Sequence, residues 1–238
     1  TDFPMGEFIL KAEADGFEPY TATVTVRPGL FSHDIYLKRP GLVAHYKFNG
    51  DAQDSSGNGN HGTVYGATLV PDRFGQANGA YSFDGKDDYI EVEHKSFIKE
   101  DRMEISVAAW MKSMGNPGTA IAVFANDFLI YESPDKLGFS ISTPSTKTVF
   151  KDISYNQWVH FVGTYDGTKI KIYINGAADP AFEEHQGAIS NLGRNLNFGR
   201  DLIKPSEPRY WRGIIDDFRI YDRVLTAEEI NELASHKP

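Results

Sequence analysis

The sequence predicts an all-β protein, built as a two-sheet antiparallel jelly-roll sandwich with a small N-terminal three-strand β segment and one short C-terminal helix. The first observation is that apolar and polar residues alternate along many short segments, which is the pattern of a strand with one buried face. The second is that turn-forming pairs separate these segments, at Asp84-Gly85, Asp166-Gly167 and Asn175-Gly176. Alternation gives each sheet one apolar face, which must be covered, so two sheets are expected to pack face to face. With about ten or more strands, a jelly roll is the expected arrangement.

The composition narrows the class of protein. The 238 residues include 40% hydrophobic and 13% aromatic side chains, so the chain is globular, with room for one large β domain and a small appendage. Cysteine is absent and the net charge is −9, so no disulfides form, and nucleic acid, which needs clustered basic residues, is not an expected partner. No apolar run of about 18 residues occurs, so we expect no membrane span. The chain starts at Thr1 without a signal peptide, which we interpret as a mature or excised fragment.

Residues 1–39 are predicted to form a separate β segment. Its three strands, divided by turn residues, are residues 7–13, 20–26 and 31–38. The phrase GEFILKAEADGFEPYTATVTV resembles the last half of a carboxypeptidase-regulatory or PEGA-type β domain, whose earlier strands are missing here. Three strands leave two open edges, so we expect this segment to pair with another chain or domain. Residues 40–41 form the linker to the main domain, residues 42–238.

The main domain shows the pattern of an antiparallel all-β domain from Leu42 to Tyr221. Isoleucines and lysines alternate over residues 168–174, between two turn signals, so one face of that strand is apolar and the other charged. Equivalent patterns occur at residues 42–48, 105–111, 137–141, 158–162 and 214–221. One helix closes the chain. Thr226 and Glu229 have the spacing of a capping box, and Ile230 and Leu233 supply a short apolar stripe.

A polar loop at residues 51–62, DAQDSSGNGNHG, is a candidate metal site. The spacing of Asp54, Ser56 and Asn58 matches the opening half of a helix–loop–helix calcium loop, with oxygens at alternate positions followed by glycine. The second half of the calcium-loop pattern is missing, because Tyr65 occupies the position where a bidentate glutamate is required. The loop therefore offers about three or four oxygens, whereas calcium takes about six to eight. The alternative is that these are ordinary turn residues.

Asp216 is the most informative carboxylate elsewhere in the chain. By alternation it shares a face with three apolar residues, Ile214, Phe218 and Ile220. We therefore expect Asp216 to face the core, where a carboxylate must be paired, hydrogen-bonded or bound to a metal. Both an arginine partner, such as Arg200 or Arg212, and a metal ion remain open at this point.

Four segments carry a family resemblance: LVAHYKFNGDAQDSSGNGNHGTV, DRFGQANGAYSFDGKDDYIEV, QWVHFVGTYDGTKIKIYINGA and WRGIIDDFRIYDRVLTAEEI. In this order they resemble the concanavalin-A-like, laminin-G-like jelly roll of bacterial surface proteins, from Leu42 to about Leu233. The resemblance implies a non-catalytic module that binds glycans or proteins, with a structural calcium ion in many members. It also implies the calcium ligands, which are Asp54, Asn58 and the carbonyl of Asn60 in the loop, and the distant Asp216.

Residue patterns for catalysis are sparse. Glycosidases of the fold that this chain resembles use a Glu-x-Asp-x-(x)-Glu strand, and the nearest match here, Glu91-Val92-Glu93, lacks the middle aspartate. The histidines are scattered without a zinc motif. The Gln-x-His and Tyr-Lys patterns of jelly-roll lyases are also absent. We therefore predict that the protein is not an enzyme.

Side chains at or near predicted loops are the candidates for binding a sugar. Tyr131, Arg209 and Tyr210 are the predicted carbohydrate-binding residues, because a flat ring covers the apolar face of a sugar while polar neighbours bind its hydroxyls. Residues 201–210 interrupt the strand pattern with two prolines and mixed charge, which suits the lining of a site. The alternative is a plain connecting loop with ordinary exposed tyrosines. The tryptophans are instead predicted to pack in the core or at a sheet edge, namely Trp110, Trp158 and Trp211.

The sequence thus predicts a non-catalytic recognition module outside the cell or on its surface, with a glycan as the favoured ligand and a structural calcium ion. The alternative is a structural or assembly domain that mediates protein–protein contacts in a surface layer or secreted complex. The incomplete sheet of residues 1–39 favours that alternative, because open strand edges invite pairing with another chain.

Overall fold

The structure is a computed structural model, and it describes residues 6–12, 20–26, 41–93, 102–115, 119–124, 128–143, 145–190, 195–202 and 206–235. The chain divides into two compact units, Thr1–Leu42 and Val43–Pro238.

The first unit contains an antiparallel pair of strands. β1 (Gly6–Ala12) and β2 (Tyr20–Val26) are paired along their whole lengths, from Gly6 opposite Val26 to Ala12 opposite Tyr20. They correspond to the first two strands predicted for this segment. The predicted third strand, residues 31–38, lies outside the described residues.

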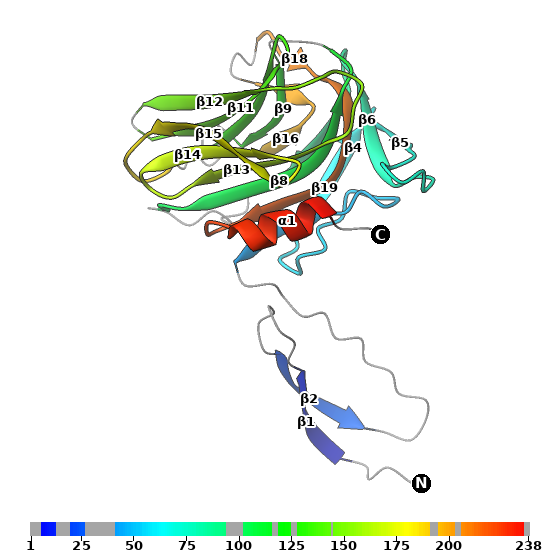
Figure 1. Cartoon of the computed structure of the whole chain (residues 1–238). Coiled ribbons are helices and arrows are strands. Elements are labelled where there is room, and N and C mark those ends of the chain that lie inside the picture. Colours follow the sequence, from blue (N-terminus) through cyan, green and yellow to red (C-terminus); the bar gives the residue numbers. More distant parts are fainter. Residues whose placement is uncertain are drawn as a thin grey trace. The chain divides into compact units, whose positions relative to one another are not determined.

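The second unit is a sandwich of two antiparallel sheets and confirms the predicted fold class (Figure 1). The seven-stranded sheet has the order β12-β11-β10-β9-β16-β7-β4, and the eight-stranded sheet has the order β15-β14-β13-β8-β19-β6-β5, with β3 also paired to β19. The strands of the first sheet are β4 (Gly62–Tyr65), β7 (Tyr89–Val92), β9 (Thr119–Phe124), β10 (Phe128–Ser133), β11 (Lys136–Ser142), β12 (Thr146–Asp152) and β16 (Leu196–Phe198). Those of the second are β3 (Leu42–Tyr46), β5 (Thr68–Val70), β6 (Ala80–Asp84), β8 (Ile105–Ser113), β13 (Val159–Tyr165), β14 (Lys169–Ile174), β15 (Ala177–Glu184) and β19 (Arg212–Tyr221).

Side chains from both sheets meet in one apolar core. The inward-facing residues predicted for two strands are all found there, each at most 2% exposed: Ile105, Val107, Ala109, Met111, Leu137, Phe139 and Ile141. The two sheets approach closely at Gly163 of β13, where an added Cβ atom would collide with the ring of Phe139. Glycine at this position therefore lets the ring of one sheet pack directly on the backbone of the other.

The turn predicted between β14 and β15 is present. Asn175 and Gly176 have positive φ angles of 51° and 82°, as a type I′ hairpin turn requires. On β14 the isoleucines Ile170 and Ile172 are fully buried in the core, whereas Lys171 between them is only half-buried. The alternation of residues along β14 and the residues of the turn therefore both specify the observed hairpin.

On one side of the sandwich the edge strands of the two sheets lie against each other. β12 ends the seven-stranded sheet and β15 ends the eight-stranded sheet, and the two strands are in contact. Lys151 and Asp179 form an ion pair between them, with 2.5 Å between nitrogen and oxygen. β15 also contains Pro180, and its register against β14 shifts between Lys171 and Tyr173.

A β-bulge in β19 decides which face its carboxylates occupy. The pairing of β19 with β8 shifts register between Asp216 and Arg219, and Asp217 has a φ of 51°. Ile215 before the shift and Phe218 after it both join the core, so Asp216 lies on the outer face of the sheet. The prediction that Asp216 faces the core is therefore wrong, because strict alternation does not anticipate the extra residue of a bulge.

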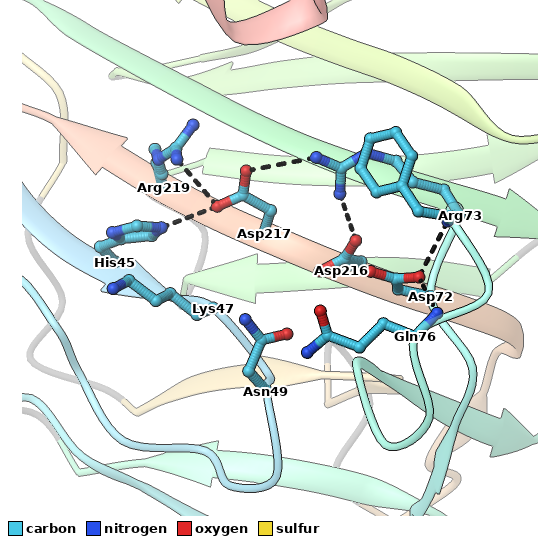
Figure 2. A pocket seen from close by; sticks show the side chains of 10 residues that line it. His45, Lys47, Asn49, Asp72, Arg73, Gln76, Asp216, Asp217 and Arg219 are labelled. Atoms are coloured by element: carbon cyan, nitrogen blue, oxygen red, sulfur yellow. Dashed lines mark hydrogen bonds and ion pairs between the residues drawn. The ribbon is translucent and has the colours of Figure 1, made fainter. Parts of the chain in front are cut away.

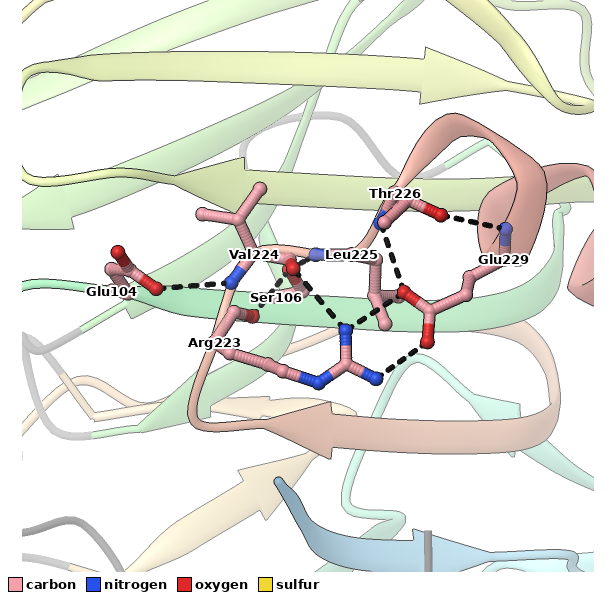
Figure 3. Close-up of polar contacts among 7 residues, drawn as sticks. All are labelled: Glu104, Ser106, Arg223, Val224, Leu225, Thr226 and Glu229. Atoms are coloured by element: carbon pink, nitrogen blue, oxygen red, sulfur yellow. Dashed lines mark hydrogen bonds and ion pairs between the residues drawn. The ribbon is translucent and has the colours of Figure 1, made fainter. Parts of the chain in front are cut away.

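The C-terminal helix α1 (Ala227–Ser235) begins with the predicted capping box (Figure 3). The backbone N–H of Glu229 donates to the Thr226 hydroxyl at 3.3 Å, and the backbone N–H of Thr226 donates to the Glu229 carboxylate at 2.9 Å. The guanidinium of Arg223 binds the same carboxylate at 2.5 Å. The predicted apolar stripe is buried, namely Ile230 and Leu233. In the part of the chain that the structure describes, no helix has the length and apolarity to cross a membrane.

Candidate functional site

The loop predicted to bind calcium is held by its own hydrogen bonds. Asp54 is 6% exposed, and its carboxylate accepts four hydrogen bonds at 2.8–3.0 Å. The donors are the backbone N–H groups of His45, Ser56 and Asn60 and the hydroxyl of Ser56. Such a carboxylate orders a turn without an ion, because it satisfies buried backbone donors directly.

The other predicted loop ligands, Asn58 and Asn60, are also engaged. Their side-chain amides both donate to the carbonyl of Val43, at 2.9 and 3.0 Å. The carbonyl oxygen of Asn60, itself a predicted ligand, accepts the hydroxyl of the buried Tyr46 at 2.7 Å. Asp216 belongs to a separate ion-pair network on the outer face of the eight-stranded sheet. As placed, these residues do not fit a calcium site, and calcium binding stays an untested prediction.

Two of the predicted carbohydrate-binding residues, Arg209 and Tyr210, form a short strand of their own. This strand, β18 (Arg209–Tyr210), pairs with β17 (Arg200–Asp201). The guanidinium of Arg209 forms an ion pair with the buried carboxylate of Asp201. Tyr210 lies directly opposite Arg200, and residues directly opposite in an antiparallel pair share a face. Tyr210 therefore lies beside Arg200.

Arg200 in turn belongs to an aromatic stack on the outer face of the seven-stranded sheet. Its guanidinium carbon lies 3.5 Å from the ring centroid of Tyr89, and its Nη2 atom binds the carboxylate of Glu91 at 2.6 Å. From the neighbouring strand β4, Tyr65 stacks on Tyr89 with 4.5 Å between centroids and 13° between planes. Tyr65 is 43% exposed and ends the stack at the sheet edge. Glu91, the nearest match to a catalytic carboxylate in the sequence, is paired with Arg200.

Tyr131, the third predicted carbohydrate-binding residue, lies on the same face of this sheet. Its neighbours Ile130 and Glu132 are fully buried, so Tyr131 points outward by alternation. Tyr131 is opposite Gly138 on β11, which is opposite Phe150 on β12. The exposed ring of Phe150 covers Gly138, because an added Cβ there would collide with it. We call the outward-facing aromatic residues the aromatic face, namely Tyr65, Tyr89, Tyr131, Phe150 and Tyr210.

Sequence reasoning selected Tyr131 and Tyr210 but missed the other three members of the aromatic face. A signal for them was present in the sequence. Tyr89 precedes the core residue Ile90, and Phe150 follows the core residue Val149, so both occupy the outward phase of a strand. One aromatic residue in that phase is ordinary, but several on strands of the same sheet form a patch, and a patch indicates a binding surface.

A second site is a polar pocket of about 350 Å³ on the outer face of the eight-stranded sheet (Figure 2). It lies between β3, β19 and the loop that joins β5 to β6. We call it the outer-face pocket, and its volume is within the range of small-ligand sites. Its floor consists of five side chains, His45, Arg73, Asp216, Asp217 and Arg219. Its rim consists of five more, Lys47, Asn49, Asp72, Phe74 and Gln76.

Ion pairs join the floor of the outer-face pocket into one network. The carboxylate of Asp217 accepts a hydrogen bond from Nε2 of His45 at 2.7 Å and binds Arg219 at 3.0 Å. Arg73 lies 3.9 Å from Asp217 and forms a closer ion pair with Asp216. All five side chains are only 4–12% exposed, so water has little access to these pairs and screens them weakly.

Burial and neighbouring charges separate the pKa values of the two carboxylates. Burial raises the pKa of Asp216 to about 7, against the lowering effect of Arg73. Burial also raises the pKa of Asp217, but the hydrogen bond from His45 and the charge of Arg219 outweigh it and lower that pKa to about 2. Carboxylates with diverging pKa values mark acid–base sites in some enzymes. Here both are buried and bonded to arginine, so the arrangement is that of a rigid polar floor rather than an exposed acid–base pair.

The family profile Laminin_G_3, described as the concanavalin A-like lectin/glucanases superfamily, matches residues 84–231. The chain therefore belongs to this superfamily. No curated protein matches the chain by sequence.

Solved structures share the fold. One is domain 4 of AbnA, a GH43 extracellular arabinanase from Geobacillus stearothermophilus, in complex with arabinotriose; it is 22% identical, with a TM-score of 0.66, over 82% of this chain and 98% of that chain. Another is the receptor binding domain of botulinum neurotoxin C/D mosaic serotype, which is 17% identical, with a TM-score of 0.66, over 82% of this chain and 51% of that chain. A third is the botulinum neurotoxin serotype G binding domain, at 18% identity and a TM-score of 0.65, over 81% and 50%. The chain spans about half the length of these neurotoxin domains, and at such identities the likeness is one of fold.

Proposed function

We propose that the protein is a non-catalytic carbohydrate-binding module of an extracellular or cell-surface protein. The observation that carries the proposal is the aromatic face on the outside of the seven-stranded sheet. Membership of a lectin and glucanase superfamily supports it. So does the similar domain of the extracellular arabinanase, which holds arabinotriose.

The aromatic face has the chemistry that sugar recognition needs. A sugar ring presents an apolar C–H face, which packs on an aromatic ring, and hydroxyl groups, which need hydrogen-bonding partners. Tyr65 and Tyr89 are stacked and backed by Arg200, so their rings are ordered before a ligand arrives and less entropy is lost on binding. The hydroxyls of Tyr65 and Tyr89 have no hydrogen bond to another described residue, which leaves them available to a ligand.

The arrangement favours an extended chain over a single sugar. Tyr65 and Phe150 lie on the two edge strands of the seven-stranded sheet, β4 and β12. Six steps between strands of about 4.8 Å each separate these edges, which is roughly 29 Å. Tyr89 and Tyr131 lie between them on the same face. We therefore expect an oligosaccharide or polysaccharide segment to lie across the strands.

Retention on polysaccharides tests this proposal. The whole chain is run by affinity electrophoresis through gels that contain arabinan, xylan, galactan or a soluble cellulose derivative. Tyr89→Ala removes the ring on which Tyr65 and Arg200 are both stacked, so the exposed Tyr65 ring loses its support, and we expect binding to weaken about fivefold, which is about 1 kcal/mol. The matched control is Phe182→Ala, which removes an exposed aromatic side chain from β15 of the other sheet. Equal mobility of wild type and Tyr89→Ala in every gel would remove the aromatic face as the binding site.

A second candidate function is assembly through the N-terminal unit. Among the described strands, β1 and β2 pair only with each other, so each has an edge that can accept a strand from another chain. Sedimentation of the chain with and without residues 1–41 tests self-assembly. A monomer in both cases would count against it.

A further inference from the structure

The outer-face pocket lies on the opposite sheet from the aromatic face, and binding of a glycan chain to that face leaves the pocket without a role (Figure 2). We propose that the outer-face pocket is a second carbohydrate subsite, which takes one neutral sugar residue at the end of a glycan chain. This inference rests on the proposed carbohydrate-binding function and names the kind of ligand that a second surface would hold.

The floor supplies a rigid base for such a ligand, and this base is formally neutral above about pH 7, where Asp216 is ionised. Two arginines stand against two aspartates, and burial lowers the pKa of His45, so the imidazole is neutral at pH 7. The guanidinium of Arg73 lies 4.4 Å from the ring centroid of Phe74 and 4.7 Å from that of Trp110. Ion pairs and rings therefore hold the floor in place before a ligand arrives, which reduces the entropy lost on binding.

The rim supplies hydrogen-bonding groups that the protein leaves for a ligand. The side chains of Lys47, Asn49 and Gln76 line the pocket and make no hydrogen bond or ion pair with any other described residue. Figure 2 shows the side-chain amides of Asn49 and Gln76 pointing toward one another. Each amide offers two donors and one acceptor oxygen, and the ammonium group offers three donors. Adjacent hydroxyls of a sugar need this mixture of donors and acceptors.

The carboxylate of Asp72 adds an acceptor to the rim. One of its oxygens accepts the backbone N–H groups of Phe74 and Gln76, both at 2.8 Å, and so fixes the shape of the loop. Its other oxygen has no hydrogen bond within the described residues. Beside it, the ring of Phe74 is 45% exposed and provides an apolar surface for the C–H groups of a sugar.

Charge and size select the class of ligand. On the rim, Lys47 and Asp72 carry opposite formal charges that cancel, and the floor is formally balanced. Above about pH 7, where Asp216 is ionised and positive charge is not in excess, the pocket favours a neutral sugar over a phosphorylated, sulfated or uronic one. A volume of about 350 Å³ is near the small end of the range for ligand sites, so it suits the end residue of a chain.

Nuclear magnetic resonance of the whole ¹⁵N-labelled protein tests the inference. The probes are three neutral trisaccharides, arabinotriose, xylotriose and cellotriose, and one acidic trisaccharide, trigalacturonic acid. We expect at least one neutral probe to shift the side-chain amide signals of Asn49 and Gln76 in a saturable way. Gln76→Ala, which removes one hydrogen-bonding group, should weaken this binding about fivefold. The matched control is Gln157→Ala, an exposed glutamine outside the pocket, which should change nothing.

The variant Tyr89→Ala separates this inference from the proposed function. Shifts of Asn49 and Gln76 that persist in this variant would establish the pocket as an independent subsite. Neutral probes that bind in a Tyr89-dependent way but leave both amide signals unmoved would overturn the second subsite while the proposed function stands. Tighter binding of trigalacturonic acid than of every neutral probe would overturn the neutral class. Absence of binding by any probe or polysaccharide would overturn both proposals.

Discussion

Replacing Asp54 by alanine removes the carboxylate that organises residues 51–62. In the structure it accepts four hydrogen bonds, three of them from backbone N–H groups. A buried donor without a partner costs about 1–3 kcal/mol. The loop can relax and such costs are not additive, so we expect Asp54→Ala to lower the free energy of unfolding by about 3–5 kcal/mol. For a protein of this size each kcal/mol lowers the melting temperature by about 2–4 °C, which makes a loss of roughly 10 °C.

Urea unfolding followed by tryptophan fluorescence measures this loss, with thermal unfolding as a second observable. The matched control is Asp51→Ala in the same loop, whose carboxylate accepts one exposed hydrogen bond, from the backbone of Gln53 at 3.0 Å. We expect the control to change stability by less than about 1 kcal/mol. A loss below about 1 kcal/mol for Asp54→Ala would refute the claim that this carboxylate holds the loop.

The same measurements with chelator and with added calcium address the metal. If hydrogen bonds alone order the loop, the melting temperature of the wild type is equal in both conditions, and Asp54→Ala costs the same in each. A saturating ion would instead raise the wild-type stability, by about 2.7 kcal/mol at 100 times its dissociation constant. If calcium raises the melting temperature of the wild type by several degrees but leaves that of Asp54→Ala unchanged, the loop does bind calcium.

Four further expectations follow from other parts of the structure. Thr226→Ala should cost about 1 kcal/mol of stability in urea unfolding through loss of the helix cap, whereas Thr226→Ser should cost little. Glu132→Ala should cost about 3 kcal/mol and change the fluorescence of Trp211, because the buried carboxylate accepts the indole N–H at 2.5 Å; an unchanged spectrum would contradict this contact. Burial lowers the pKa of His160 to about 3, below its value near 6.5 in the unfolded chain. The stability that the neutral, buried imidazole contributes is therefore fully present above pH 6.5 and is lost as the pH falls towards 3. The stability gap between wild type and His160→Gln should therefore narrow from pH 7 to pH 5 in urea unfolding, and a constant gap would disprove a buried neutral imidazole. A peptide of residues 1–41 should show no cooperative melting by circular dichroism, since so small a sheet buries too little apolar area to fold alone.

The sandwich could be predicted from the sequence because its signals are local. In the β14–β15 hairpin, the alternation of isoleucine with lysine and the Asn175-Gly176 turn each specify the backbone without reference to distant residues. The bulge in β19 could not be predicted in this way. Asp216 and Asp217 are adjacent polar residues in a strand, and nothing in their identity shows that the register shifts between them and Arg219.

The candidate sites were less predictable, because they depend on contacts between distant segments. The outer-face pocket joins His45, Arg73 and Asp217, which no periodic pattern connects. The loop at residues 51–62 was ambiguous for another reason. The oxygen atoms of Asp54 that could bind calcium are also those that accept backbone N–H groups, and only three-dimensional placement shows which donors are within reach.

The meeting of β12 and β15 has a consequence for behaviour at high concentration. Sheet proteins aggregate when free strand edges of different molecules join. Here the two edges lie against each other, Lys151 and Asp179 are paired between them, and Pro180 interrupts the row of N–H donors on β15. The opposite edges, β4 and β5, are only four and three residues long. We therefore expect the sandwich, residues 43–238, to stay free of edge-to-edge aggregation at high concentration.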